Sequence, residues 1–344
     1  MSVKQTYKAD IVAVARVAGV SPATVSRSMN HPDLVSPATR KKIEKAIRKT
    51  GYIRNRAAQT MHGRRSATLG LVVPTVNFSI FAELVQSFND AVSELGFTLL
   101  LATHNYDLRT EYSVVRKLLE HRVDGIALIG LDHSEDTYRL FKSQNVPVIA
   151  VWSYSESSRI SCIGSDNREA GQVAARHIVS LGHRKIGFIF PPTAENDRAR
   201  DRLDAAIEIL REAGIDCPEA WTAQSLYSIA HSKAACLALL QQYVSLTALI
   251  CGNDVIAQGA IAAAMELGLR IPQDISIIGI GDFVGSGDNF PALTTVRIPA
   301  QEIGARAGQN LVQSIADLEG DQIASFRFPV SLKQRATTAL TPDL

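Results

Sequence analysis

The chain has 344 residues, 46% of them hydrophobic and 20% charged, which is enough apolar material for one large core and a small accessory domain. Residues 1–65 hold 14 Lys and Arg against 3 Asp and Glu, a net of +11, and the remainder carries −9. A basic segment joined to an acidic body favours contact with phosphate groups, and no apolar run is long enough to cross a membrane.

The first apolar run is short and helical, and no small-residue cleavage site follows it, so we expect no signal peptide. The predicted location is the cytoplasm, in association with the nucleoid. The four cysteines, Cys162, Cys217, Cys236 and Cys251, are far apart and form no C-x-x-C pair. We therefore expect buried thiols, with no metal, cofactor or disulfide.

Residues 10–18 place apolar and small side chains at helical spacing and predict a first helix. Gly19 permits a tight bend, Ser21 can cap the next helix, and Pro22 suits its first position. Val25 would turn back onto the first helix. The other side of the second helix would approach base edges with short side chains and one forked donor. These predicted DNA-contacting residues are Ser21, Pro22, Ala23, Thr24, Ser26 and Arg27.

A third helix is predicted from Pro37 to Lys49, again behind a serine cap. Its apolar stripe consists of Ile43, Ala46 and Ile47, and its basic residues lie elsewhere. With the turn between the first two helices, it completes a three-helix DNA-binding headpiece at residues 1–54.

Three motifs carry a resemblance that covers nearly the whole chain. They are AGVS-x-x-TVSR at residues 18–27, VS-x-x-TR at 35–40 and GYI-x-NR-A-A at 51–58. In this order and spacing the run resembles the LacI/GalR family of bacterial transcription regulators. Family members usually carry an Asp where this chain has Ala13.

Residues 55–62 predict a short helix that ends at Gly63 and is too short to be stable alone in water. The resemblance implies that residues 55–66 form a hinge helix and linker. Two such helices would pair in the DNA minor groove, where Met61 would replace the usual leucine wedge. The implied DNA contacts here are Asn55, Arg56, Ala58 and Met61. A plain linker is the alternative.

From Ala67 onward, short apolar runs alternate with amphipathic stretches, first at residues 69–129 and again at 185–278. This alternation predicts an α/β fold with parallel sheets covered by helices on both faces. The resemblance implies a two-lobed core like a periplasmic binding protein at residues 67–344. Lobe one would comprise about 67–164 and 295–323, and lobe two about 165–294 and 324–340, with crossings near Gly164, Thr294 and Ala324.

Polar residues directly follow several predicted strands. In doubly wound sheets, ligands bind at the carboxyl ends of the strands, which is where these residues would lie. Taken singly, each group also fits a helix cap. The resemblance implies effector contacts at Phe81, Asp166, Arg202, Tyr227, Asn253 and Asp282. Where many sugar-responsive members have an Asp, this chain has Gly281, and residues 279–283 look like relatives that respond to sugar acids such as gluconate. Losing a carboxylate near Arg202 favours an anionic sugar derivative.

Enzyme motifs are not found. No G-x-x-x-x-G-K-[ST] loop occurs, and His177, His183 and His231 lack metal spacing or a nucleophile partner. A secreted solute-binding receptor would need a signal peptide and no headpiece. A regulator of the catabolite-control type, in which a partner protein replaces the small effector, stays open.

The sequence therefore predicts a transcriptional repressor that is not an enzyme and binds pseudo-palindromic, double-stranded operator DNA. Its effector would be a sugar or sugar acid in the cleft between the lobes. Residues 335–344 contain a proline and no leucine heptad, so we expect a homodimer rather than the tetramer that such a tail supports in this family.

Overall fold

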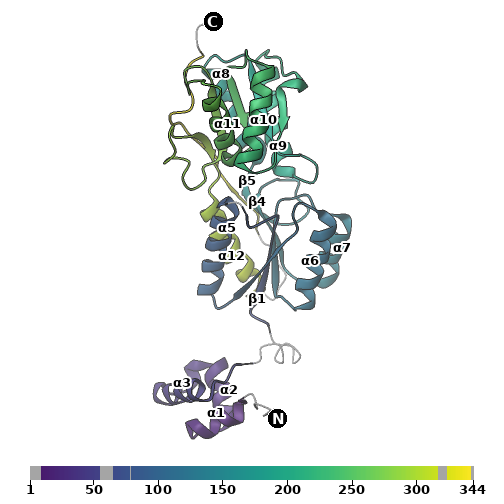
Figure 1. Ribbon diagram of the computed structural model, residues 1–344. Coiled ribbons are helices and arrows are strands. Elements are labelled where there is room, and N and C mark those ends of the chain that lie inside the picture. Colours follow the sequence, from purple (N-terminus) through teal and green to yellow (C-terminus); the bar gives the residue numbers. More distant parts are fainter. Residues whose placement is uncertain (1–8, 55–64, 78, 317–323, 342–344) are drawn as a thin grey trace, which may run out of the picture. The chain divides into compact units, whose positions relative to one another are not determined.

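The computed structural model describes residues 9–54, 65–77, 79–316 and 324–341. The chain divides into two compact units, residues 1–66 and 67–344, and each is treated by itself. Figure 1 gives the labels of the elements.

The headpiece has three helices, α1 (Ile11–Ala18), α2 (Pro22–Asn30) and α3 (Pro37–Thr50), with a short 3-10 turn η1 (Pro32–Leu34). Gly19 ends α1 in the left-handed conformation with φ 67°, which glycine adopts without strain. The fully buried Val25 of α2 packs with Val14 of α1 and Ile43 of α3. The three predicted helices are therefore present, and α3 continues one residue beyond Lys49.

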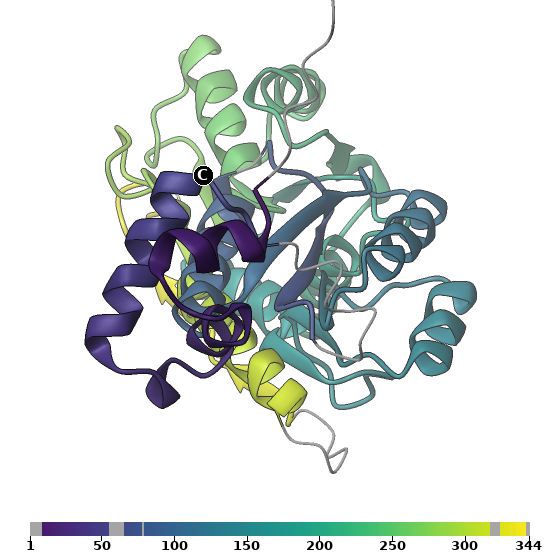
Figure 2. The ribbon, with the colours of Figure 1, turned by 90° about the horizontal axis from the view of Figure 1, so that it is seen from below.

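The first sheet of the larger unit has the strand order β11-β5-β4-β3-β1-β2, and all its pairings are parallel. Its elements in chain order are β1 (Thr68–Val73), α5 (Ser79–Glu94), β2 (Thr98–Thr103), α6 (Leu108–Glu120), β3 (Gly125–Ile129), α7 (Glu135–Gln144), β4 (Val148–Ser153) and β5 (Cys162–Ser165). Later in the chain α12 (Ala300–Ala316) and β11 (Phe326–Phe328) return to this sheet. Helices α5 and α12 cover one face, and α6 and α7 cover the other (Figures 1 and 2).

The second sheet has the order β12-β10-β9-β8-β6-β7, parallel except at β12. Its elements are α8 (Asn167–Ser180), β6 (Ile186–Phe190), α9 (Asp197–Glu212), η2 (Glu219–Trp221), β7 (Thr222–Gln224), α10 (Ile229–Gln242), β8 (Ala248–Cys251), α11 (Asp254–Glu266), β9 (Ser276–Gly281), β10 (Thr294–Arg297) and β12 (Ser331–Lys333). The paired helices α8 and α9 lie on one face and α10 and α11 on the other. The predicted α/β architecture with parallel sheets is confirmed.

The chain crosses between the lobes three times, and two crossings lie later than the sequence predicts. Strand β10 pairs with β9 in the second sheet, so the second crossing follows Arg297 and not Thr294. Strand β11 pairs with β5 in the first sheet, so the third crossing follows Phe328 and not Ala324. The expected boundaries were misplaced because a short strand carries too weak a pattern to show which sheet it joins.

Among the described residues, no helix is long and apolar enough to span a bilayer.

The α8–α9 contact fixes the backbone that carries Arg202. A Cβ atom on Gly171 of α8 would lie 2.1 Å from the Arg202 carbonyl oxygen of α9. Only glycine allows the two helices to approach so closely, so residue 171 sets the depth of Arg202.

Gly171→Ala should therefore destabilise the protein by about 1–3 kcal/mol, because added atoms overpack a backbone contact. Thermal or denaturant unfolding of the full chain measures this. The exposed Arg176→Ala on the same helix serves as control and should stay within about 0.5 kcal/mol of wild type. Equal stability of the Gly171 and Arg176 variants would show that the two helices can separate without cost.

Candidate functional site

The start of α2 carries the residues that the sequence predicts to contact DNA. The Thr24 N–H donates to Ser21 Oγ at 3.1 Å, and Pro22 occupies the first turn. Pro22, Ala23 and Arg27 are exposed, and Thr24 and Ser26 are half-buried. Small side chains around one long guanidinium leave the helix free to enter a major groove.

The first helix is capped by Asp10. Asp10 Oδ1 accepts a hydrogen bond from the Ala13 N–H at 2.7 Å. The residues predicted to read the minor groove, Asn55, Arg56, Ala58 and Met61, lie outside the described residues.

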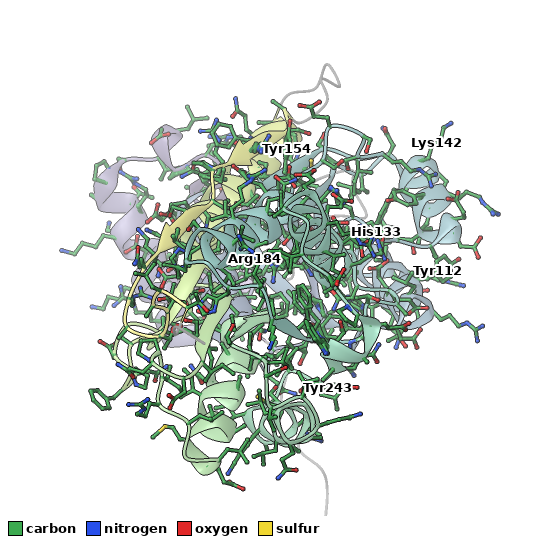
Figure 3. The ribbon with its side chains drawn as sticks, turned by 90° about the horizontal axis from the view of Figure 1, so that it is seen from above. Tyr112, His133, Lys142, Tyr154, Arg184 and Tyr243 are labelled. Atoms are coloured by element: carbon green, nitrogen blue, oxygen red, sulfur yellow. The ribbon has the colours of Figure 1, made fainter. Side chains whose placement is uncertain are left out.

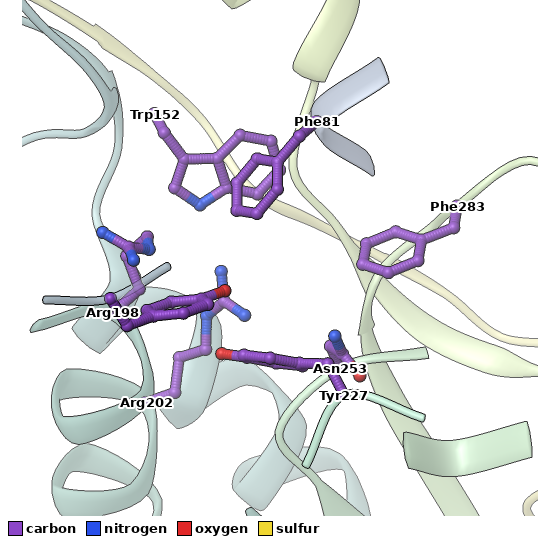
Figure 4. A pocket seen from close by; sticks show the side chains of 8 residues that line it. Phe81, Trp152, Arg198, Arg202, Tyr227, Asn253 and Phe283 are labelled. Atoms are coloured by element: carbon purple, nitrogen blue, oxygen red, sulfur yellow. The ribbon is translucent and has the colours of Figure 1, made fainter. Parts of the chain in front are cut away.

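A pocket lies where the carboxyl ends of strands from both sheets meet (Figure 4). It encloses about 340 Å³ of empty space, including the part open to solvent. Its lining consists of Phe81, Tyr106, Trp152, Arg198, Arg202, Tyr227, Asn253 and Phe283. Five of these side chains are aromatic, two are cationic, and none is acidic.

The aromatic side chains come from both lobes. Tyr106 follows β2 and stacks on Tyr227, which follows β7, with ring centroids 5.7 Å apart and 24° between the planes. Phe81 of α5 meets Trp152 of β4 edge to face at 6.3 Å. Figure 4 shows Phe81 and Trp152 together on one wall. Such walls suit a ligand with at least one flat apolar face.

The backbone at Trp152 is strained. Its φ is +80°, a value that large side chains rarely adopt, and strain of this kind gathers at ligand sites. Gly164 pairs with Trp152 in the adjacent strand β5, and a Cβ at Gly164 would lie 2.3 Å from the Trp152 carbonyl carbon. Glycine at 164 therefore makes room for the turn that presents the indole.

Arg202 supplies a buried cation. Its Nε donates to Asn167 Oδ1 at 2.9 Å and its Nη1 donates to the Gly252 carbonyl at 3.0 Å. Among the described residues it has no ion pair with a carboxylate, and its Nη2 has no hydrogen-bond acceptor. Burial lowers the pKa of Arg202 to about 10, which still leaves the group charged at neutral pH.

Arg198, one turn earlier on α9, has a charge that is already balanced. Its Nη1 lies 2.7 Å from Asp197 Oδ1, and both side chains are buried. Burial lowers the pKa of Arg198, but Asp197 and the two pocket tyrosines outweigh it, so the net shift is upward. Arg202, and not Arg198, is therefore the cation available to a ligand.

Asn253 and Tyr227 add directional polar groups. Asn253 caps α11 through its Oδ1, which accepts from the Ile256 N–H at 2.9 Å, and so its amide N–H groups stay available. The Tyr227 hydroxyl accepts a hydrogen bond from Asn196 Nδ2 at 3.0 Å. Both side chains meet at the base of the pocket in Figure 4.

The structure explains why residue 281 can be a glycine. Gly281 has φ +140°, and a Cβ there would lie 1.9 Å from the Phe283 ring. Phe283 thus fills the space that a side chain at 281 would need.

The expected effector residues separate into two groups. Phe81, Arg202, Tyr227 and Asn253 meet in the pocket, but Asp166 and Asp282 do not line it. Asp166 caps α8 and lies 3.6 Å from Arg327. Asp282 has φ +58° and pairs with Arg335 at 2.6 Å. Both carboxylates hold their own chain segments in this structure, and their contact with an effector stays a prediction.

Tyr106, Trp152, Arg198 and Phe283 are the lining residues that the predicted set omitted. Tyr106, Trp152 and Phe283 each lie at or just after the carboxyl end of a parallel strand, and Arg198 starts a helix. A search of all residues at the carboxyl ends of the predicted strands, and not only of the polar residues there, would have found the three aromatic residues.

His133 and His183 make structural contacts and do not line the pocket. His133, which is labelled in Figure 3, belongs to lobe one. Its Nδ1 contacts the Glu111 carboxylate at 3.0 Å, and its ring packs against Tyr138 and Phe141. His183 contacts Thr247, Ser276 and the Ala339 carbonyl. Within the described ranges, no group of three or more His, Cys, Asp or Glu side chains could hold a metal ion.

Comparison with known proteins agrees with both units. Residues 10–55 match the family model "Bacterial regulatory proteins, lacI family", and residues 175–338 match "Periplasmic binding protein-like domain". The HTH-type transcriptional repressor PurR of Photorhabdus laumondii is 31% identical over 315 residues, which cover 91% of this chain and 92% of the relative.

Solved structures show the same fold. A LacI-family regulator from Silicibacter pomeroyi superposes with a TM-score of 0.86 at 24% identity, over 96% of this chain and 99% of the other. The lac repressor dimer bound to operator and the anti-inducer ONPF superposes with a TM-score of 0.83 at 27% identity, with the same coverage. The chain therefore belongs to the lacI family of bacterial regulatory proteins and is a DNA-binding transcriptional repressor of the LacI type.

Proposed function

We propose that a small anionic ligand of the carbohydrate type, such as a sugar acid, occupies the pocket between the lobes and changes the affinity of the repressor for its operator. The lac repressor structure with an anti-inducer supports control by a small molecule in this fold. The class of ligand is inferred from the pocket itself.

The unpaired guanidinium of Arg202 carries the proposal. A buried cation loses its hydration, and an anion on Nη2 would offset that loss through a charge-assisted hydrogen bond. No acidic side chain is among the lining residues, so a ligand carboxylate would touch no like charge in the pocket wall.

The remaining lining fits a sugar chain or ring. The C–H faces of a sugar can stack on Tyr106 and Tyr227, while its hydroxyl groups pair with the Asn253 amide. The same aromatic walls also fit a neutral purine base, which would make no use of the Arg202 charge. Control by a partner protein, the other alternative, would leave the pocket without an anionic ligand.

Calorimetry on the full chain should detect binding of gluconate and much weaker binding of glucose, its neutral counterpart of similar size. Arg202→Met should weaken gluconate binding at least about tenfold, because a charge-assisted hydrogen bond is lost while an unbranched apolar stem is kept.

Arg211→Met is the matched control, since Arg211 is exposed on the same helix. It should bind gluconate as the wild type does. Preference for glucose or for a purine base would contradict the anionic ligand, and failure of every small molecule would favour the partner protein.

For the headpiece, Arg27→Ala should cost roughly 1–3 kcal/mol on the specific operator and relax base preference, because Arg27 is placed to reach base edges. Substitution of Ala23 should change the selected operator sequence more than the total affinity. Fluorescence anisotropy and operator selection measure these effects. Lys45→Ala, on α3, is the control and should leave base preference unchanged. If the Ala23 variant selects the same operator sequence as the wild type, α2 does not contact the bases in the orientation expected here.

Assembly as a homodimer predicts a pseudo-palindromic operator with two half-sites. Light scattering should give a dimer at micromolar concentration, and an inverted repeat should bind far more tightly than one half-site. A stable monomer, or equal affinity for one and two half-sites, would count against this assembly.

A further inference from the structure

Arg202 begins a continuous chain of buried hydrogen bonds that leads away from the pocket. After the bond from Arg202 Nε, Asn167 Nδ2 donates to Ser153 Oγ at 3.1 Å. Ser153 Oγ in turn donates to Asp197 Oδ2 at 3.3 Å. All four residues are 5% exposed or less. We call the three residues Asn167, Ser153 and Asp197 the relay.

The relay joins the two lobes. Ser153 ends β4 in lobe one, whereas Asn167 and Asp197 belong to α8 and α9 of lobe two. Asp197 Oδ2 also accepts from the Leu131 N–H of lobe one at 2.8 Å. The carboxylate of one lobe is thus held by a hydroxyl and a backbone amide of the other.

The direction of each hydrogen bond is fixed. Asn167 Oδ1 accepts from an arginine, so the Asn167 amide nitrogen must be the donor to Ser153. The single hydroxyl hydrogen of Ser153 then goes to Asp197, which can only accept while ionised. A shift of the Arg202 guanidinium therefore changes every later bond, because none of the groups can reverse its role.

We propose that Asn167 and Ser153 are positioning residues, which transmit the state of Arg202 to lobe one through Asp197 and Leu131. Neither residue lines the pocket, so their effect would not come from touching the ligand. The use of this relay in regulation rests on the proposed function, because a ligand on Arg202 is what would displace the guanidinium.

Ser165 provides a matched control for Ser153. The two serines are paired in register on the adjacent strands β5 and β4, and Ser165 is fully buried. Its Oγ has no hydrogen-bond partner among the described residues. Ser165→Ala thus removes a buried hydroxyl from the same sheet without breaking a bond.

Hydrogen–deuterium exchange at the Leu131 amide, in the ligand-free full chain, tests the relay directly. Ser153→Ala should speed exchange by roughly tenfold, since the Asp197 carboxylate loses one of its two contacts with lobe one. Ser165→Ala should leave the rate unchanged. Equal rates in the two variants would overturn the relay.

The link to Arg202 is tested by combining substitutions. Arg202→Met should also speed Leu131 exchange, but should add little in the Ser153→Ala background, because both changes act through the same bonds. Asn167→Ala replaces Arg202→Met if the latter does not fold. Fully additive effects would show that Arg202 and Ser153 act independently.

Gluconate separates this inference from the proposed function. Ser153→Ala should bind gluconate within about threefold of wild type, but lose most of the gluconate-induced change in operator affinity. A full operator response, or a loss of binding as large as in Arg202→Met, would overturn the positioning role. If gluconate binds neither the wild type nor any variant, the proposed ligand is wrong. The hydrogen–deuterium exchange rates of Leu131 then test by themselves whether the relay links Arg202 to lobe one.

Discussion

The burial of one uncompensated guanidinium is the constraint around which the core is built. Arg202 is held by an amide oxygen and a backbone carbonyl, and neither acceptor cancels its charge. A buried charge of this kind lowers the stability of the fold unless other interactions offset the loss of its hydration. Gly171 sets the depth of the helix that carries it, and the neighbouring Arg198 is neutralised by Asp197. The proposed ligand anion would supply the charge partner that is absent among the described residues.

Local chemistry made the headpiece predictable from sequence. The Ser21 and Ser36 caps, Pro at the following positions and Gly19 at the bend each act within a few residues, and each was found where expected. The alternation of apolar strands with helices likewise predicted both parallel sheets. Short strands such as β11 (Phe326–Phe328) were not assignable, because their place depends on distant partners rather than on their own pattern.

The pocket was only partly predictable for the same reason. Arg202 and Asn253 follow from their motifs, but whether a carboxylate faces the pocket depends on its other neighbours. Asp282 is drawn away by Arg335, a residue 53 positions later in the chain. Trp152 enters through a strained backbone that Gly164 permits, and the sequence of β4 carries no sign of that strain.

The most direct test of this account measures operator affinity of the full-length wild type by fluorescence anisotropy, with gluconate and with glucose at matched concentrations and ionic strength. The account predicts that gluconate changes the operator Kd by at least about tenfold, within the usual range of allosteric coupling, and that glucose does not. An equal response to both sugars, or none to either, would contradict control through the Arg202 charge.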